Sequence, residues 1–434
     1  MQTTRRDFLK IAASVAGLGI LAPLSACGTP SSSAATTDGG KVQVEYWHTN
    51  PQSRGGDTVE AQIEAFNAQS ADVEVVARYN DGYDGLMKNL QADAAANKMP
   101  DLVQVSYSNI EYFPSTFAFT PADQVAKLAG KSDFISSEFP DNIIKLGTDS
   151  RGEVVGFPYA VSDPIFYYNA DVFAEAGIDK APETWQEVRD DARVILDKTG
   201  KQPFHLQEND TWALQAYLAC NGGDMLKWEG QKAQATLSDD ANVKAMEFYY
   251  EMVRDKLAIH ISTDEALKAF NAGDLAMIAT SCANLAGIEK AAQFTVATSK
   301  WPVFEGQRRR VPAGGCVLAV TSSDDARRKA VMEFVEYLYQ ADNIVDWVKG
   351  TGYVAHTKTA QESDAMKQLL EDDPLRAAAA SQVDDIIPWA AWPGDSAQQA
   401  QQTISDMRDQ VLSGSKDAKT ALTDANDKIN GLIK

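Results

Sequence analysis

Three strand-like stretches alternate with two helix-like stretches between residues 41 and 106, and this order restricts the fold more than any other feature of the chain. In residues 41–46, apolar side chains alternate with polar ones, which is typical of a half-buried strand. Residues 73–79 and 102–106 are further stretches of strand character, and the segments between the three place apolar side chains on one helical face. This order predicts a parallel sheet covered on both faces, and therefore an α/β fold.

The ends of these three strands are the first place to look for a ligand site. Ligands of open α/β sheets lie beyond the carboxyl ends of the strands. Those ends are residues 47–50, 80–84 and 106–109. Asp84 has an alternative role as an acid stabilised by the helix dipole. The candidate binding residues at these ends are His48, Asn50, Tyr83, Asp84 and Tyr107.

The rest of the chain indicates more than one lobe. Apolar stretches at 154–157 and 165–168 are expected to be strands joined by residues 158–164, and further strands are expected at 204–206, 275–280, 294–298 and 315–320. From residue 323 onwards the pattern is mainly helical. The chain has 434 residues, of which 44% are hydrophobic and 23% charged, a normal globular composition. It is too long for one ordinary core, so we expect two lobes.

The first 26 residues have the layout of an export signal. A basic start that contains Arg5, Arg6 and Lys10 precedes an apolar run over residues 11–24, and small residues flank Cys27. The apolar run is shorter than the roughly 20 residues that a membrane-spanning helix needs. The small, polar residues up to 40 are expected to form a flexible linker.

Two motifs in this segment resemble known bacterial signals. The pair Arg5-Arg6 followed by Phe8-Leu9-Lys10 resembles the twin-arginine signal, with an ordinary secretion signal as the alternative. The sequence LSAC that ends at Cys27 resembles the lipobox. This resemblance implies that Cys27 becomes the first residue and carries lipid, with a plain thiol as the alternative. The body would then be tethered to the outer face of a bacterial plasma membrane, with the lipid anchor as its only membrane contact.

Charge and cysteine content exclude two classes of protein. The formal net charge is −21, and the body without its basic signal is more acidic still, which disfavours binding to nucleic acid or anionic lipid. Beyond Cys27 the chain holds Cys220, Cys282 and Cys316, an odd number that cannot form a complete disulfide framework. Buried thiols and a single Cys282–Cys316 bond are the two alternatives.

Five groups of short motifs follow one another over nearly the whole chain after Cys27. They are VEYWHT at 44–49 with Phe66-Asn67, GFPY at 156–159 leading into FYYN at 166–169, APETW at 181–185, FNAGDLAM at 270–277, and GTGYV at 350–354. The fourth is the most specific. In order and spacing they resemble the extracellular family 1 class of solute-binding proteins of ABC importers, which serves sugars and glycerol phosphates.

This resemblance implies a two-lobe, periplasmic-binding-protein-like α/β fold with hinge-crossing strands and a ligand cleft between the lobes. The first lobe is expected to hold residues 41–162 and 277–316, and the second lobe residues 163–276 and 317–434. Lobes of this kind close around a ligand by hinge motion. The family further implies a permease partner. We expect a monomeric binder that is no enzyme and has no cofactor or metal.

The resemblance also implies binding residues. In relatives that bind glycerol 3-phosphate or glycerophosphodiesters, the ligand-contacting positions match Tyr83, Ser162, Trp212, Ser281, Gly315 and Tyr353 here. This chain departs from them at Tyr107, which replaces a Glu, and at Trp392, which lies near the place of a phosphate-binding Arg. An indole cannot replace an arginine fork, but it can stack on a sugar ring. The departures favour a neutral saccharide, with a glycerol phosphate as the alternative. Asp163, at the first expected crossing, and Asn284 complete the candidate set.

Structural roles compete with these assignments. Trp212 also fits a helix core, while Ser162, Ser281 and Asn284 also fit ordinary turn or cap positions. Gly315 marks either a strand bulge or a close approach of the backbone to the ligand. Trp389 and Trp392 lie in a proline-rich loop, where two indoles are hard to bury, and we expect Trp392 in particular to contact the ligand.

Catalytic patterns are weak in this sequence. His48, His205, His260 and His356 form no pair at metal-binding spacing. No G-x-S-x-G motif is present, and Gly130-Lys131-Ser132 lacks the first glycine of a phosphate-binding loop. A glycosidase needs two carboxylates at a fixed separation, which the sequence alone does not reveal. An extracellular glycoside hydrolase is the alternative from another class, and it would consume its ligand where a binder returns it intact.

Overall fold

The fold is taken from a computed structural model that describes residues 40–394 and 396–433. The expected signal peptide at 1–26, the lipidation site Cys27 and the expected linker up to residue 39 lie outside these residues. None of the described helices is long and apolar enough to cross a membrane. Cys220, Cys282 and Cys316 are buried free thiols, which excludes the Cys282–Cys316 bond.

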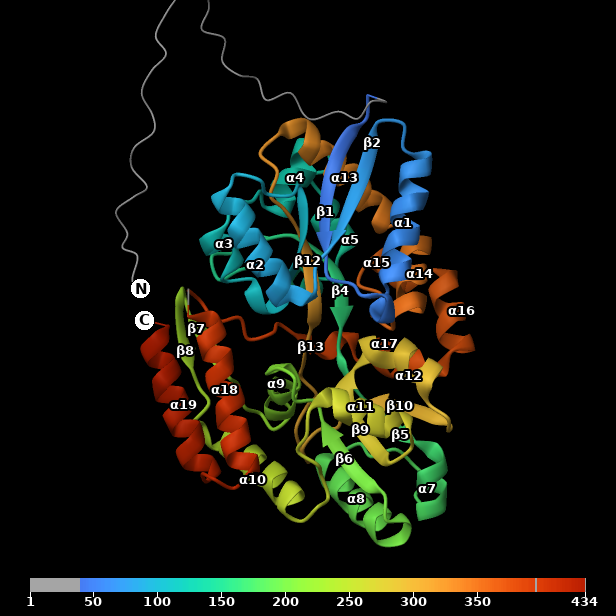
Figure 1. Ribbon diagram of the computed structural model, residues 1–434, viewed down its shortest axis with the longest axis vertical. Coiled ribbons are helices and arrows are strands. Elements are labelled where there is room, and N and C mark those ends of the chain that lie inside the picture. Colours follow the sequence, from blue (N-terminus) through green and yellow to red (C-terminus); the bar gives the residue numbers. More distant parts are fainter. Residues whose placement is uncertain (1–39, 395, 434) are drawn as a thin grey trace, which may run out of the picture. The chain divides into compact units, whose positions relative to one another are not determined.

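The first sheet has five strands in the order β2-β1-β3-β12-β4 and lies in the upper half of Figure 1. β1 pairs in parallel with β2 and with β3, which confirms the parallel arrangement predicted for residues 41–106. All five residues of β3 are buried, as expected for a central strand covered on both faces. β12 runs antiparallel to both its neighbours. The strands are β1 (Val42–His48), β2 (Val73–Tyr79), β3 (Leu102–Ser106), β4 (Phe157–Ser162) and β12 (Gly314–Val320).

The second sheet has four strands in the order β10-β5-β9-β6 and lies in the lower half of Figure 1. β9 runs antiparallel to β5 and parallel to β6. Before β6, helix α8 (Trp185–Thr199) begins with a capping box made by Thr184 and Glu187. Its first residue, Trp185, packs edge-on against Phe204 of β6 and is fully buried. The strands are β5 (Pro164–Asn169), β6 (Gln202–Leu206), β9 (Leu275–Ser281) and β10 (Val296–Lys300).

The prediction of a strand at residues 154–157 is wrong in its bounds. β4 begins at Phe157 and ends at Ser162, so that Asp163 alone separates it from β5. The expected connection at 158–164 is therefore mostly strand. Pro158 fits within β4 because the pairing with β12 shifts register between Cys316 and Val317, opposite this proline.

The strand pairing also corrects the expected division of the chain between the lobes. Most of β9 and all of β10 lie in the segment 277–316, which we expect in the first lobe, yet both pair with β5 in the second sheet. The later part of β12 lies in the segment 317–434, expected in the second lobe, yet it pairs with β3 and β4 in the first sheet. The resemblance implied the number of lobes and the approximate crossings, but the sheet to which each strand belongs depends on long-range pairing that short motifs do not encode.

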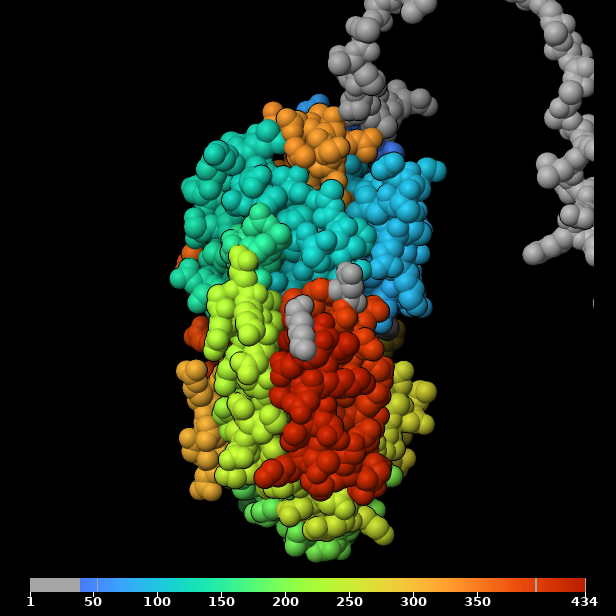
Figure 2. Space-filling model, turned by 90° about the vertical axis from the view of Figure 1, so that its left-hand side faces the viewer, coloured from blue at the N-terminus to red at the C-terminus, as the bar shows by residue number. Residues whose placement is uncertain are grey.

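The helices after β12 divide between the two lobes. α13 (Asp325–Leu338) packs against β1, and α14 (Ala341–Thr351) packs against α1 (Gly56–Gln69), so both belong to the first lobe. α18 (Ala397–Leu412) and α19 (Ala418–Leu432) pack against α10 (Asp240–Arg254) in the second lobe. Figure 2 shows α18 and α19 in red beside the yellow-green hairpin of β7 (Leu226–Glu229) and β8 (Lys232–Ala235).

The remaining elements complete these layers and connect them. In the first half of the chain they are α2 (Gly82–Ala95), α3 (Phe113–Thr116), α4 (Ala122–Leu128), α5 (Phe134–Glu138), α6 (Asp141–Leu146), α7 (Ala170–Ala176) and α9 (Trp212–Ala219). In the second half they are α11 (Thr263–Asn271), α12 (Leu285–Ala291), β11 (Val311–Pro312), α15 (Lys358–Glu362), α16 (Asp364–Asp372), α17 (Ala377–Ala380) and β13 (Ile386–Ile387). The 3-10 turns are η1 (Gln52–Arg54), η2 (Tyr107–Asn109), η3 (Cys282–Asn284), η4 (Pro374–Arg376) and η5 (Val383–Asp385).

Candidate ligand-binding cleft

A cavity of about 220 Å³ lies where the two sheets meet. From the first lobe, α2 supplies Tyr83, and the adjoining ends of β4 and β12 supply Ser162 and Gly315. From the second lobe, α9 supplies Trp212 and the end of β9 supplies Ser281. Because both lobes provide walls, the cavity has the position expected of an interlobe ligand site.

The structure gathers most of the predicted residues around this cavity. Those that line it are Tyr83, Ser162, Trp212, Ser281, Asn284, Gly315 and Tyr353. Two neighbouring hollows extend it, one of about 570 Å³ that includes Tyr83 and Asp84, and one of about 540 Å³ that includes Tyr107. Trp389 lines the cavity and both hollows. We call this continuous surface the cleft.

His48 and Asn50, although predicted at the end of β1, are buried inside the first lobe and line none of these hollows. The His48 ring lies between the rings of Tyr46 and Tyr79, at 5.7 and 5.8 Å, and burial lowers its pKa to about 4. The Asn50 Oδ1 accepts a hydrogen bond of 2.8 Å from Gln104 Nε2. Both side chains stabilise the strand end, so their prediction as ligand contacts is wrong for this structure.

Asp163 and Trp392 are also absent from the cleft lining. Asp163 is fully buried, and its Oδ2 accepts a hydrogen bond of 2.8 Å from Gln382 Nε2. Trp392 is fully buried as part of the hydrophobic core, which contradicts its expected role as a stacking surface. Two indoles are hard to bury in a loop, but this loop is tied to α9, whose Gln215 amide donates to Pro388 O and accepts from Ala390 N, and one of its two indoles is buried.

Trp389, which the sequence analysis ranked below Trp392, is the indole of this loop that reaches the cleft. Its ring centroid lies 6.4 Å from that of Trp212, and the two ring planes are tilted by 52°. The indole nitrogens of both side chains have no hydrogen-bond partner among the described residues. Both nitrogens are buried, Trp212 is 2% exposed and Trp389 is partly exposed, so the pair contributes apolar ring surface to the cleft wall, mainly through Trp389.

A polar segment of the second lobe was missed by the sequence analysis. Gln207, Asn209 and Asp210 follow β6 directly and line the cavity, and Thr263 and Asp264 join them from the start of α11. The position of ligands beyond strand ends, expected for the first three strands, would have drawn attention to the end of β6 as well. Arg54 of η1 also lines the cavity and is exposed.

Sequence comparison agrees with this geometry. A family profile described as bacterial extracellular solute-binding protein matches residues 61–379, most of the chain. The chain belongs to this family. The sn-glycerol-3-phosphate-binding periplasmic protein UgpB of Escherichia coli (strain K12) is 26% identical to this solute-binding protein over 411 residues, which cover 90% of this chain and 92% of UgpB.

Solved structures of similar fold come from two-lobe binding proteins. The cyclic α-maltosyl-1,6-maltose binding protein from Arthrobacter globiformis superimposes with a TM-score of 0.78 at 22% identity, covering 91% of this chain and 100% of that one. UgpB from Mycobacterium tuberculosis, solved with glycerophosphocholine, gives a TM-score of 0.77 at 20% identity, covering 90% and 98%. At these identities the likeness establishes the shared two-lobe fold of this solute-binding protein.

The charges that line the cavity of this solute-binding protein are unbalanced toward carboxylate. Asp210 and Asp264 face the single cation Arg54 among the described lining residues. Burial raises the pKa of Asp210, although the Trp212 backbone N–H donates a hydrogen bond of 2.9 Å to its Oδ1. Burial also raises the pKa values of Tyr83 and Tyr353, so both phenols are neutral donors. The carboxylates of this cavity supply hydrogen-bond acceptors, and the phenols supply donors, for the hydroxyl groups of a bound molecule.

Gly315 lies beside an irregularity of the strand pairing and also in the cavity wall. Its φ of +109° favours glycine, and a Cβ there would overlap the backbone of Ala160 on β4. Gly315 itself pairs with Val161, and the register shift comes after Cys316, where Tyr159 of β4 is the extra residue; the glycine therefore lies next to the bulge, on the facing strand. Gly314 and Gly315 also line the cavity, where their small size leaves room beside Trp212.

One group of described side chains has the composition of a metal site. Ligand atoms of Glu208, His260 and Asp409 lie within 4.8 Å of one another. The Arg408 guanidinium, however, already contacts Asp409 Oδ1 at 2.8 Å, and His260 Nδ1 lies 2.6 Å from Glu208 Oε2. Because the Arg408 guanidinium already supplies a positive charge, these side chains form a complete ion-pair network without a metal ion. This network holds α18 against the end of β6.

Proposed function

We propose that this protein captures a saccharide in the interlobe cleft and delivers it to the permease of an ABC importer. The tilted pair Trp212 and Trp389 carries this proposal, because indole faces match the apolar faces of sugar rings. The amides, hydroxyls and carboxylates of the surrounding wall match the dense hydroxyl groups of such a ligand. When the lobes close over it, each buried hydroxyl needs a protein partner, and this wall supplies acceptors and donors.

A glycerol phosphate is the alternative ligand. It is favoured by the exposed Arg54 in the cavity wall and by the similarity to glycerol-3-phosphate-binding UgpB. Against it stand Asp210 and Asp264, whose negative charges would repel a phosphate at short range. The balance of charge therefore supports the neutral ligand.

The test is a thermal-shift screen with mono- and oligosaccharides, glycerol 3-phosphate and glycerophosphodiesters, followed by titration calorimetry on each hit. A ligand that binds only the folded state raises the melting temperature. For a saccharide, Trp389→Ala is expected to weaken binding at least about tenfold, which corresponds to about 1.4 kcal/mol, while Arg54→Ala has little effect. A larger loss of binding in Arg54→Ala than in Trp389→Ala would support the glycerol phosphate. If none of these ligands raised the melting temperature, both the saccharide and the glycerol phosphate proposals would be contradicted.

Two matched variants control for general damage to the fold. Tyr250→Ala removes a partly buried aromatic ring from α10, outside the cleft lining, and Arg308→Ala removes an exposed arginine from a loop. Both are expected to bind the ligand like the unaltered protein. Recovery of the bound ligand chemically intact, measured by mass spectrometry, would distinguish capture from hydrolysis.

We further propose that lipid on Cys27 tethers the protein, as a monomer, to the outer face of the cell membrane after export through the twin-arginine route. The motifs at Arg5-Arg6 and at LSAC support this. Metabolic labelling with an alkyne fatty acid should mark the protein, and Cys27→Ala should abolish the label and release the protein. Export that survives Arg5→Lys combined with Arg6→Lys would point instead to the general secretory route.

A further inference from the structure

The interlobe cavity, at about 220 Å³, is smaller than the roughly 300–1,000 Å³ that is usual for a ligand site. A saccharide that filled this cavity alone would be small. The size of the ligand therefore depends on whether a neighbouring hollow continues the cavity. Three hollows adjoin it, and they differ in the wall residues that they share with the cavity and in the polar groups that they leave free.

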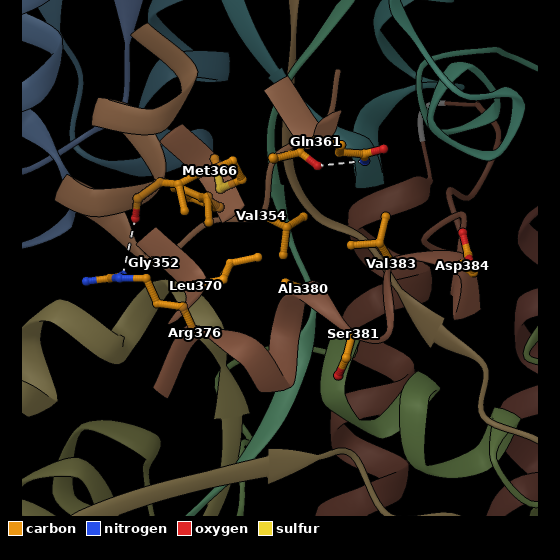
Figure 3. A pocket seen from close by; sticks show the side chains of 13 residues that line it. Gly352, Val354, Gln361, Met366, Leu370, Arg376, Ala380, Ser381, Val383 and Asp384 are labelled. Carbon is orange, nitrogen blue, oxygen red and sulfur yellow. Dashed lines mark hydrogen bonds between the residues drawn. The ribbon is translucent and has the colours of Figure 1, made fainter. Parts of the chain in front are cut away.

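The hollow drawn in Figure 3 is a poor continuation of the cavity. Tyr353 is the only described residue that lines both. The two largest polar side chains of its wall are already bonded within the protein. Gln361 Nε2 donates a hydrogen bond of 2.9 Å to Ala355 O. Arg376 Nη1 donates one of 3.2 Å to Val348 O.

The hollow beside the β7–β8 hairpin, of about 540 Å³, shares only Trp389 with the cavity among the described residues. Charged groups of its wall are also engaged already. Arg310 Nη2 lies 2.7 Å from Asp224 Oδ1. Glu111 Oε1 accepts a hydrogen bond of 2.7 Å from the backbone N–H of Ser150. A ligand that entered this hollow would have to compete with these contacts.

The third hollow, of about 570 Å³, lies between α2 of the first lobe and α18 of the second, and we call it the α2–α18 groove. Four described residues line both this groove and the cavity, so the two form one continuous space. They are Tyr83, Asn209, Asp210 and Trp389. Because Trp389 lies at the junction, a saccharide that packs against its indole is led from the cavity into the groove.

α18 presents a stripe of uncharged polar side chains to the groove. The stripe consists of Gln398, Gln401, Gln402 and Ser405, at the spacing that places residues on one helical face. It covers about 10 Å of helix, which is longer than one sugar ring. The apolar positions of the same helix, Ala397, Ala400 and Ile404, are buried on another face.

Two glutamines of this stripe are free to bind a ligand. Gln402 Nε2 donates a hydrogen bond of 2.7 Å to Asp406 Oδ1. The structure gives the Gln398 and Gln401 amides no hydrogen-bond partner among the described residues. Each amide offers two N–H donors and one carbonyl acceptor, which suits the hydroxyl groups of a sugar.

The opposite wall of the groove is acidic. Asp81 and Asp84, at the start of α2, are exposed, and Asp210 lies beside them in the lining. Lys88 is the single cation among the described lining residues. The excess of carboxylate disfavours a phosphate or an acidic sugar, and it accepts hydrogen bonds from hydroxyl groups. The groove therefore selects a neutral, hydroxyl-rich chain.

We propose that the α2–α18 groove is a subsite of the cleft, and that the ligand is a neutral oligosaccharide whose chain passes from the cavity over Trp389 and along α18. This inference rests on the proposed function, because it takes the ligand to be a saccharide. It adds the direction in which the ligand extends. It also assigns to Gln398 and Gln401 the selection for chain length.

Titration calorimetry with glucose, maltose, maltotriose and maltotetraose, and with the matching cello-oligosaccharides, tests this inference. In the series that binds, affinity should rise at least about tenfold from the shortest saccharide that binds to longer ones. The double variant Gln398→Ala, Gln401→Ala should weaken the tetrasaccharide by about tenfold through two lost hydrogen bonds. It should leave binding of the shortest saccharide unchanged.

Gln399→Ala is the matched control, because Gln399 is an exposed glutamine of the same helix that does not line the groove. Alanine favours helix at all three positions, so the variants are expected to fold. Gln399→Ala should bind every saccharide like the unaltered protein. A crystal structure of the tetrasaccharide complex should show sugar rings along α18.

Three outcomes would overturn the inference and leave the proposed function standing. They are an affinity that does not depend on chain length, a double variant that binds short and long saccharides with equal loss or with no loss, and sugar density in the hollow beside the β7–β8 hairpin instead of along α18. If no saccharide bound at all, the proposed function itself would fail, and this inference with it.

Discussion

Gln382 Nε2 donates a hydrogen bond of 2.8 Å to Asp163 Oδ2, and both side chains are fully buried. Asp163 separates β4 from β5 and so marks the first crossing between the sheets. The same Gln382 amide donates to Pro164 O at 2.7 Å and accepts from the backbone N–H of Trp301 at 3.1 Å. The Gln382 side chain thus ties its own loop to two other segments, residues 163–164 and residue 301, where the lobes meet.

The first prediction concerns the pH dependence that Asp163 imposes on stability. Burial raises its pKa to about 7, against about 3.9 in an unfolded chain. The folded state therefore holds a proton that the unfolded state has released, and stability falls as pH rises from about 4 to about 7. Asp163→Asn removes this titration. Urea unfolding measures the free energy of unfolding of both proteins. Between about pH 5 and about pH 8, this free energy should fall in the unaltered protein relative to the variant by roughly a few kcal/mol.

Asp384→Asn is the control for this measurement, because Asp384 is exposed. It should follow the pH profile of the unaltered protein. If Asp163→Asn and the unaltered protein gave parallel profiles, the buried carboxyl would not be the source of the pH dependence.

The second prediction concerns His260, which ties α18 to the end of β6. The hydrogen bond to Glu208 at 2.6 Å raises the pKa of His260; burial and Arg408 oppose this shift, and the charges of Glu208 and Asp409 add to it. Its stabilisation is complete below about pH 6.5 and is lost as pH rises through the raised pKa. His260→Gln should lower the free energy of unfolding by about 1 kcal/mol at about pH 5.5 and by much less at about pH 9. The melting temperatures measured at the two pH values report this difference. An equal loss at both pH values would show that the imidazolium has no special role.

The third prediction separates the two indoles of the proline-rich loop. Trp392 is fully buried, so Trp392→Ala should destabilise the fold by about 3–5 kcal/mol through lost packing. Trp389 lines the cleft, so Trp389→Ala should cost little stability and should act on ligand binding. Differential scanning calorimetry without ligand compares the two directly. Comparable losses in melting temperature would indicate that Trp389 is also a core residue.

The contrast between these two indoles illustrates what the sequence could predict. Alternating strand and helix patterns before residue 106 were sufficient for the parallel sheet, because each pattern is local. The order of short motifs was sufficient for the family. Which of Trp389 and Trp392 faces the ligand depends on how the loop packs against α9, a long-range contact. The prediction of the lobes to which β9 and β12 belong was wrong for the same reason, because strand pairing is also a long-range contact.

The fourth prediction uses the adjacent glycines at the start of β12, which differ in what a methyl group would meet. At Gly315 a Cβ would overlap the Ala160 backbone, and φ is +109°, so Gly315→Ala should cost about 1–3 kcal/mol of stability. At Gly314 a Cβ would lie 2.6 Å from Ser162 Oγ and 3.2 Å from the Trp212 ring. Gly314→Ala therefore displaces two cleft side chains and should weaken ligand binding more than it lowers stability. Urea unfolding measures the loss of stability in both variants, and titration calorimetry measures their ligand binding. A larger stability loss in Gly314→Ala, with a larger binding loss in Gly315→Ala, would contradict the assignment of Gly315 to backbone packing and of Gly314 to the cleft wall.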